Sequence, residues 1–132
     1  MARTSPQGAA PDAVEEFRAH AQEVMRSADA SCGVEELEPE LEAALGVLLG
    51  NLHLRAQFER EIVSLLDRID EGVIELVSYT MHEVRWEPVR QDIERRLMSP
   101  TADVSARRHY EAMLDAFSDN WRDRDLYGRF SQ

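Results

Sequence analysis

The chain has 132 residues, 43% of them hydrophobic and 31% charged, which suffices for one globular domain that folds without disulfides or a structural metal. Its 26 acidic residues outnumber 15 basic ones, and the net charge of −11 repels phosphate backbones and anionic lipids, so we expect neither nucleic acid nor a membrane as its main partner. All 15 basic residues are arginine, and the absence of lysine excludes Schiff-base nucleophiles and the phosphate-binding lysine of Walker-type sites.

Residues 1–11 are polar and rich in Pro, Gly and Ala, and they show no hydrophobic periodicity, so we predict a disordered tail there. This stretch has no apolar core of the signal-peptide kind, and the single cysteine, Cys32, cannot form an intramolecular disulfide. Both observations favour a cytoplasmic protein. The longest apolar run, residues 43–50, is far shorter than the ~20 residues that a membrane-spanning helix needs.

Hydrophobic spacing predicts three helices in the first half of the chain. The first covers residues 12–28, where a capping aspartate precedes apolar residues that recur at intervals of three and four. The second begins between Glu36 and Pro39, so that the proline falls in its first turn, and ends in a left-handed cap at Gly50. A third apolar stripe follows over residues 54–69. A single helix kinked at Gly50 is the alternative to two separate helices.

Three more helices are expected over residues 73–86, 88–97 and 103–117. The first of these is apolar enough to lie at the centre of the core, Pro88 separates it from the next, and Asp103 caps the last. Residues 121–130 add a short docked turn. No segment alternates polar and apolar residues for long enough to form a strand. We therefore predict an all-α domain, residues 12–132, of about six helices in an antiparallel bundle or in stacked helical hairpins.

The histidines show no metal-binding pattern. A carboxylate-bridged metal site in a helical bundle needs Glu-x-x-His twice. The residues three positions before His20, His53, His82 and His109 are Phe17, Gly50, Tyr79 and Ala106. The chain also lacks His-x-x-x-His pairs, Cys-x-x-Cys spacing and the Gly-x-Ser-x-Gly elbow of serine hydrolases. The sequence therefore predicts no metal, no cofactor and no catalytic residue.

Five glutamates in eight residues open the second predicted helix: Glu35, Glu36, Glu38, Glu40 and Glu42. One interpretation is structural, because glutamate near a helix N-terminus is favoured by the helix dipole and a charge run usually forms a solvated face. The other interpretation is a negative surface that speeds the encounter with a basic protein and binds it. Small acidic helical immunity proteins and antitoxins are similar to this chain in size and charge, but no motif identifies a family.

Two tryptophans at the ends of predicted helices suggest a second partner-binding surface, because Trp and Arg are favoured anchors of protein interfaces. The residues concerned are His82, Arg85 and Trp86 at one end, and Trp121 and Arg122 at the other. His82 and Trp86 are four residues apart and would share a helix face. Both rings would be exposed in this interpretation, and packing in the core is the alternative.

Residues 85–108 differ from the rest of the chain, because they carry a local net charge of +2. Nucleic acid binding requires a positive domain with exposed aromatic rings, and this chain is strongly negative. We expect intrahelical ion pairs instead, such as Asp92 with Arg96.

These observations lead to three hypotheses about function. The first is a non-catalytic protein-binding domain of the immunity or antitoxin kind, which neutralises or masks a basic partner such as a nuclease toxin. The second is a self-associating helical scaffold, for example a homodimer that buries the leucine-rich surface of residues 41–69. The third is a small-ligand binder or an enzyme with a site in the helix core near His82 and His109.

Overall fold

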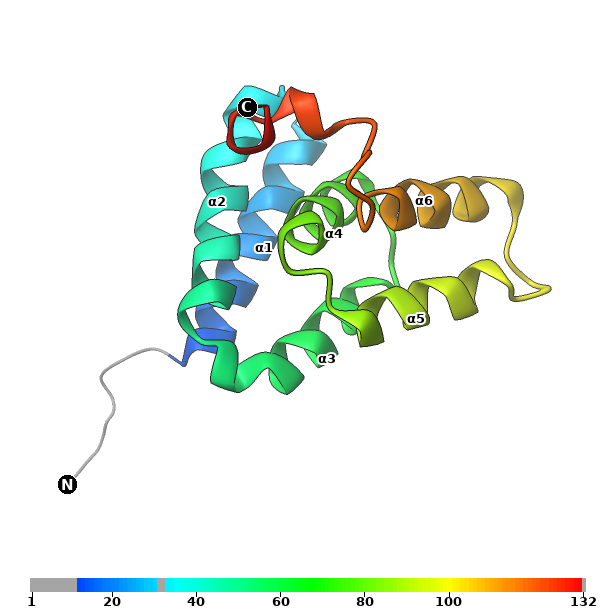
Figure 1. Ribbon diagram of the computed structural model, residues 1–132, viewed down its shortest axis with the longest axis horizontal. Coiled ribbons are helices and arrows are strands. Elements are labelled where there is room, and N and C mark those ends of the chain that lie inside the picture. Colours follow the sequence, from blue (N-terminus) through cyan, green and yellow to red (C-terminus); the bar gives the residue numbers. More distant parts are fainter. Residues whose placement is uncertain (1–11, 31–32, 132) are drawn as a thin grey trace.

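The computed structural model describes residues 12–30 and 33–131, and within these ranges the chain forms helices joined by short connections, with no β-strand (Figure 1). The α-helices are α1 (Ala13–Asp29), α2 (Val34–Gly50), α3 (Arg55–Leu65), α4 (Glu71–Val84), α5 (Glu87–Leu97) and α6 (Val104–Asp115). The described residues also form the short 3-10 helices η2 (Leu52–Leu54), η3 (Arg124–Leu126) and η4 (Gly128–Phe130). The prediction of an all-α fold with six helices is confirmed. The predicted disordered tail and Cys32 lie outside the described residues.

Helix α1 begins as predicted, because the Asp12 side chain accepts a hydrogen bond from the backbone N–H of Val14 at 3.1 Å. Helix α2 begins earlier than predicted, at Val34. The backbone N–H of Gly33 donates to the Glu36 carboxylate at 3.4 Å, which is half of a capping box. Pro39 therefore lies in the second turn of α2 and not in the first. In a first turn the backbone N–H groups have no helical acceptor, so a proline there would remove no hydrogen bond; in the second turn it removes one.

Helices α2 and α3 are separate, as predicted. The Asn51 side chain donates to the carbonyl of Val47 at 2.9 Å and thereby caps the end of α2. The predicted left-handed cap is wrong, because neither Gly50 nor Asn51 has a positive φ. The chain turns instead through η2, and α3 runs away from α2 (Figure 1).

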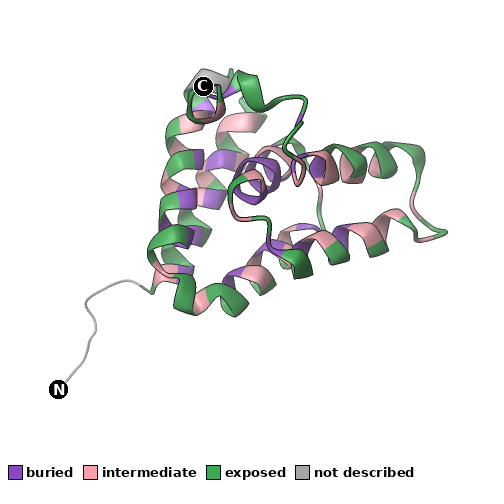
Figure 2. Ribbon diagram, in the orientation of Figure 1, coloured by how far each residue is buried: buried purple, intermediate pink, exposed green. Residues whose placement is uncertain are grey.

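Helix α4 lies at the centre of the molecule and is buried on most of its surface, as its apolar sequence predicted (Figure 2). It packs against α1 and α2, which form an antiparallel hairpin. Gly72 permits the close approach of α4 to α1, because a Cβ at this position would lie 2.5 Å from the Cα of Met25. The α5–α6 hairpin packs against the other side of α4 through α6 and extends away from α1 and α2 (Figure 1).

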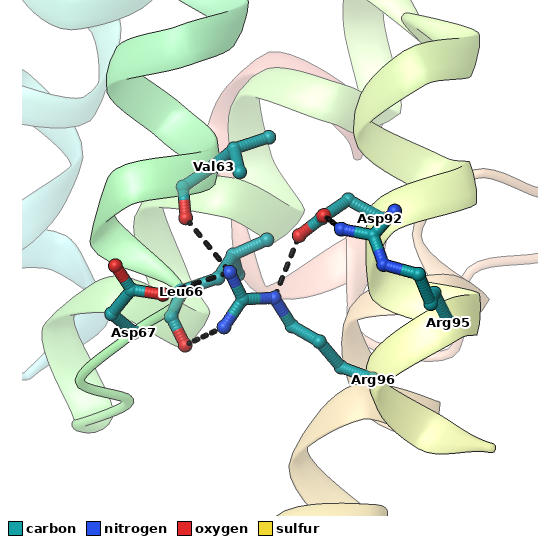
Figure 3. Close-up of polar contacts among 6 residues, drawn as sticks. All are labelled: Val63, Leu66, Asp67, Asp92, Arg95 and Arg96. Atoms are coloured by element: carbon teal, nitrogen blue, oxygen red, sulfur yellow. Dashed lines mark hydrogen bonds and ion pairs between the residues drawn. The ribbon is translucent and has the colours of Figure 1, made fainter. Parts of the chain in front are cut away.

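An arginine on α5 ties that helix to the end of α3 (Figure 3). The Arg96 guanidinium donates to the carbonyl oxygens of Leu66 at 2.9 Å and Val63 at 3.4 Å, at the C-terminal end of α3. It also contacts the buried carboxylate of Asp92 at 2.6 Å, so the predicted intrahelical pair is confirmed. Arg95 reaches the other oxygen of Asp92, which leaves this buried charge well compensated.

Candidate functional site

The glutamate run lies on the first turns of α2, and the structure shows what each described side chain contacts. Glu38 is half-buried and accepts three hydrogen bonds, from the hydroxyl of Tyr79 at 3.1 Å and from the backbone N–H groups of Gly128 at 2.9 Å and Arg129 at 3.0 Å. A carboxylate that receives three donors from two distant segments is a structural anchor. Glu38 therefore holds the C-terminal residues against α2 and α4.

Two other members of the run also bind groups of this chain. The Glu40 carboxylate lies 2.7 Å from Nδ1 of His20, which links α2 to α1. Glu42 pairs with Arg129 at 3.3 Å, and Glu83 on α4 pairs with the same guanidinium. Glu36 is exposed and contacts only the backbone of Gly33. The side chain of Glu35 lies outside the described residues.

Residues 116–131, which we call the C-terminal strap, cross the upper ends of α2 and α4 in Figure 1. Trp121 and Tyr127 are buried and stack on each other, with ring centroids 5.5 Å apart. Tyr127 packs edge-on against Tyr79 at 5.0 Å, and Trp121 packs on the ring of His82 at 4.9 Å. This aromatic cluster confirms the predicted docked turn, and it fills the space above the C-terminal half of α4.

Glu75 is the most strongly perturbed carboxylate at this junction. Burial, together with the negative charges of Glu71 and Asp123, raises its pKa from 4.5 to about 7. The Tyr127 hydroxyl donates a hydrogen bond to it. Burial also raises the pKa of the Tyr79 hydroxyl, together with the charge of Glu38. A perturbed carboxyl group can indicate a chemical site, but Glu75 already has a partner in the strap.

Of the two interpretations of the tryptophans, exposure is wrong and packing in the core is confirmed. Trp86 is 3% exposed and Trp121 is 4% exposed. The reason for Trp86 is Arg85, whose left-handed backbone (φ 49°, ψ 49°) ends α4 and turns the chain inward. The Trp86 ring then stacks on Phe58 of α3 at 6.5 Å, and the Arg55 guanidinium covers it at 5.3 Å.

The predicted common face of His82 and Trp86 is also wrong, because the turn at Arg85 separates them. Nδ1 of His82 donates to the carbonyl of Ala116 at 2.8 Å, under the strap. Arg85 is exposed and pairs with Asp119 of the strap at 2.8 Å. Arg122 is exposed, and its backbone N–H donates to Asp115 at 3.0 Å. Of this predicted surface, only the two arginines are exposed, whereas His82 is partly buried and both tryptophans are buried.

The structure does not join His82 and His109 in one site. His82 lies beneath the strap, whereas His109 lines a separate open hollow of about 300 Å³ with Leu66, Ile69 and Tyr110. Among residues 12–30 and 33–131, no three His, Cys, Asp or Glu side chains are grouped so that they could hold a metal ion. No described helix has the length and apolar character to cross a bilayer.

The negative charge is concentrated on three helices that pack against one another. Helices α1, α2 and α4 contain twelve acidic and two basic residues, whereas α3, α5 and α6 each contain equal numbers of both. We call the first group the acidic half. This asymmetry is not evident from the sequence, because α3, which has equal numbers of acidic and basic residues, lies between α2 and α4 in the chain.

Sequence reasoning missed the residues that fasten the strap, namely Glu75, Tyr79, Tyr127 and Arg129. Their partners are 41 to 91 residues away along the chain, and no local pattern marks such pairs. No protein-family model, no curated protein and no solved structure matches the chain. The function is therefore inferred from the charges and contacts described above.

Proposed function

We propose that this chain is a non-catalytic protein-binding domain whose acidic half captures a basic protein and masks the basic surface of that protein. The observation that carries the proposal is the charge asymmetry, with twelve acidic residues against two basic ones on α1, α2 and α4. A surface of one sign raises the rate of encounter with an oppositely charged partner and fixes its orientation. Immunity proteins of nuclease toxins would be an example of such a masking function.

The contacts divide the acidic residues into two groups with different roles. Glu38, Glu40 and Glu42 bind groups of this chain, so reversing their charge would damage the fold together with any interface. Glu16 and Glu36 are exposed and form no ion pair with any described residue. These two side chains are therefore suitable probes of partner binding.

The test is a pair of matched charge variants. Glu16→Arg with Glu36→Arg changes the acidic half, and Gln57→Arg with Gln91→Arg and Glu111→Arg changes the balanced half at exposed positions; each set moves the net charge from −11 to −7. The tagged chain is used to capture proteins from a lysate of its source at low salt, and each captured basic protein is purified. Stopped-flow association with that protein is then measured for the wild type and both variants.

We expect the acidic-half variant to slow association about tenfold at low salt, with a smaller difference at high salt, because steering acts mainly on the association rate. The control variant should change the rate much less, although its net charge is the same. Equal effects of the two variants would contradict a localised binding surface. Capture of no basic protein, or of proteins that bind independently of salt, would also contradict the proposal.

A further inference from the structure

Residues 127–130 of the strap lie on α2 and α4 as a short peptide lies in its binding site. The two oxygens of Glu38 accept the backbone N–H groups of consecutive residues, Oε1 that of Gly128 at 2.9 Å and Oε2 that of Arg129 at 3.0 Å. In peptide recognition, hydrogen bonds to the main chain give affinity, and contacts with individual side chains give specificity. Glu38 therefore supplies affinity for any segment that presents two such N–H groups.

The contacts that give specificity begin with the Arg129 side chain, whose guanidinium lies between carboxylates of two helices. Its Nη1 lies 3.3 Å from the Glu42 carboxylate of α2, and its Nε lies 3.3 Å from the Glu83 carboxylate of α4. Both glutamates belong to the acidic half, and their side chains are 42% and 38% exposed. An arginine of another protein can reach these two carboxylates from solvent, provided that Arg129 leaves them.

An aromatic contact follows at the next residue. The Phe130 ring packs against the rings of Tyr79 and His82, with centroids 5.0 Å and 4.7 Å apart. Ring pairs at such distances are favourable beyond the area that they bury. The groups that hold residues 128–130 form what we call the strap site: Glu38, Glu42, Tyr79, His82 and Glu83. Its chemistry fits an arginine followed by an aromatic residue.

The end of the strap is attached in a way that allows it to detach. Within the described part of the chain, the backbone–backbone hydrogen bonds of residues 119–131 run to carbonyls three residues earlier, and none joins this segment to another helix. Residues 128–131 are exposed or partly exposed, whereas Trp121 and Tyr127 are buried. Residues 128–131 can therefore lift from the strap site while Trp121 and Tyr127 stay packed, because this local opening breaks few buried contacts.

We propose that the acidic half binds its basic partner by taking an arginine–aromatic segment of that protein into the strap site, where residues 128–131 are a displaceable internal competitor. This inference rests on the proposed function, and it names the group that is captured. A segment of the same chain has a high effective concentration, so it lowers the affinity for a second segment by the fraction of time that the site is open. Weakening the strap's own contacts should therefore tighten binding. A strap with a purely structural role would give no such gain.

The probe is a fluorescently labelled peptide with the sequence of residues 126–131, Leu-Tyr-Gly-Arg-Phe-Ser, and a second peptide has glutamine in place of arginine. Fluorescence anisotropy measures their binding to the full chain and to an opened variant, Gly128→Pro with Arg129→Gln. Proline has no N–H to donate to Glu38, and glutamine has no charge for Glu42 and Glu83. Both substituted positions are exposed, and Tyr127 already has the extended backbone (φ −110°, ψ 132°) that a following proline favours.

We expect the arginine peptide to bind the opened variant about tenfold more tightly than it binds the wild type, because the site is no longer occupied. The glutamine peptide should bind the opened variant about tenfold more weakly than the arginine peptide does. Adding Glu83→Gln to the opened variant should remove most of this preference for arginine. The matched control is Arg124→Gln, which removes the same charge from a strap arginine that contacts only Asp119 and Asp125, and which should leave peptide binding unchanged.

A second opened variant, Arg129→Gln with Phe130→Ala, contains no added proline and should give the same order of affinities. Equal binding of the arginine peptide to the wild type and to both opened variants would overturn the proposal. Binding that does not distinguish arginine from glutamine, or no binding to any of these proteins, would also overturn it. None of these measurements uses a protein from the lysate, so capture of a basic protein together with a negative peptide result would retain the proposed function and reject only the strap site.

Discussion

Titration of the Glu75 side chain makes the free energy of unfolding depend on pH. Its pKa is about 7 in the folded chain and 4.5 without burial, so the folded state holds this proton more tightly than the unfolded state. The stability that this proton provides is complete below pH 4.5 and is lost as the pH rises through 7. The junction between α4 and the strap should therefore weaken under mildly alkaline conditions.

The corresponding variant is Glu75→Gln, which keeps an acceptor for the Tyr127 hydroxyl but carries no titrating group. Because the side chain is partly exposed, we expect a gain of about 1 to 2 kcal/mol in the free energy of unfolding at pH 8, and little change near pH 4.5. Urea unfolding at a series of pH values measures both. A parallel pH dependence in the variant and the wild type would show that another group is responsible.

Glu38 is the second residue on which the strap depends, because it accepts hydrogen bonds from Tyr79, Gly128 and Arg129. Glu38→Ala removes all three, and we expect a loss of about 2 to 3 kcal/mol in the free energy of unfolding. Trypsin should then cut faster at the exposed strap arginines Arg122 and Arg124.

Glu36→Ala is the matched control for that experiment, because it removes a glutamate from the same helix that contacts only the backbone N–H of Gly33. Its loss should stay below about 1 kcal/mol, and cleavage of the strap should not change. Equal losses in both variants, with equal cleavage, would mean that Glu38 does not anchor the strap.

Within the helices, two glycines show that the effect of adding a methyl group on stability depends on how closely the helix is packed. Gly46 and Gly72 both lie inside helices, but a Cβ at Gly46 meets nothing within 4 Å, whereas one at Gly72 would lie 2.5 Å from the Cα of Met25. Gly46→Ala should stabilise the fold by about 0.5 to 1 kcal/mol through helix propensity. Gly72→Ala should destabilise it by about 2 kcal/mol or more, because α1 and α4 must separate.

Chemical unfolding of these two variants compares the same substitution in two helices of one chain. Effects of the same sign would contradict the packing of α4 against α1 at Gly72. The two variants also show that α1 and α4 are closely packed at Gly72, which helix propensity alone does not predict.

For the whole molecule, twelve acidic and two basic residues on three packed helices imply repulsion within the folded state. Moderate concentrations of NaCl should therefore raise the free energy of unfolding, by about 1 kcal/mol, through screening. Glu16→Arg with Glu36→Arg should reduce this salt dependence, whereas Gln57→Arg with Gln91→Arg and Glu111→Arg should not. A stability that falls with added NaCl would indicate that ion pairs outweigh repulsion.

The helices and their order were predictable because their signals are local. Caps such as Asp12 and Asp103 act on residues two or three positions ahead, and apolar spacing repeats every three or four residues. The sequence left open whether Trp86 is exposed or buried, because the answer depends on the left-handed backbone of Arg85, and no glycine or asparagine at that position marks the turn. The role of Glu38 was hidden because its donors lie 41 to 91 residues away.

Local patterns in the sequence were enough to predict the helical class, the number of helices, the central position of the fourth helix and the sign of the net charge. The folded arrangement was needed to show which glutamates anchor the strap, that the tryptophans are buried, and that the acidic helices pack against one another. The physical reason is the range of the interactions. Helix formation is fixed within a few turns of chain, whereas burial, charge clustering and strap docking depend on contacts between distant segments.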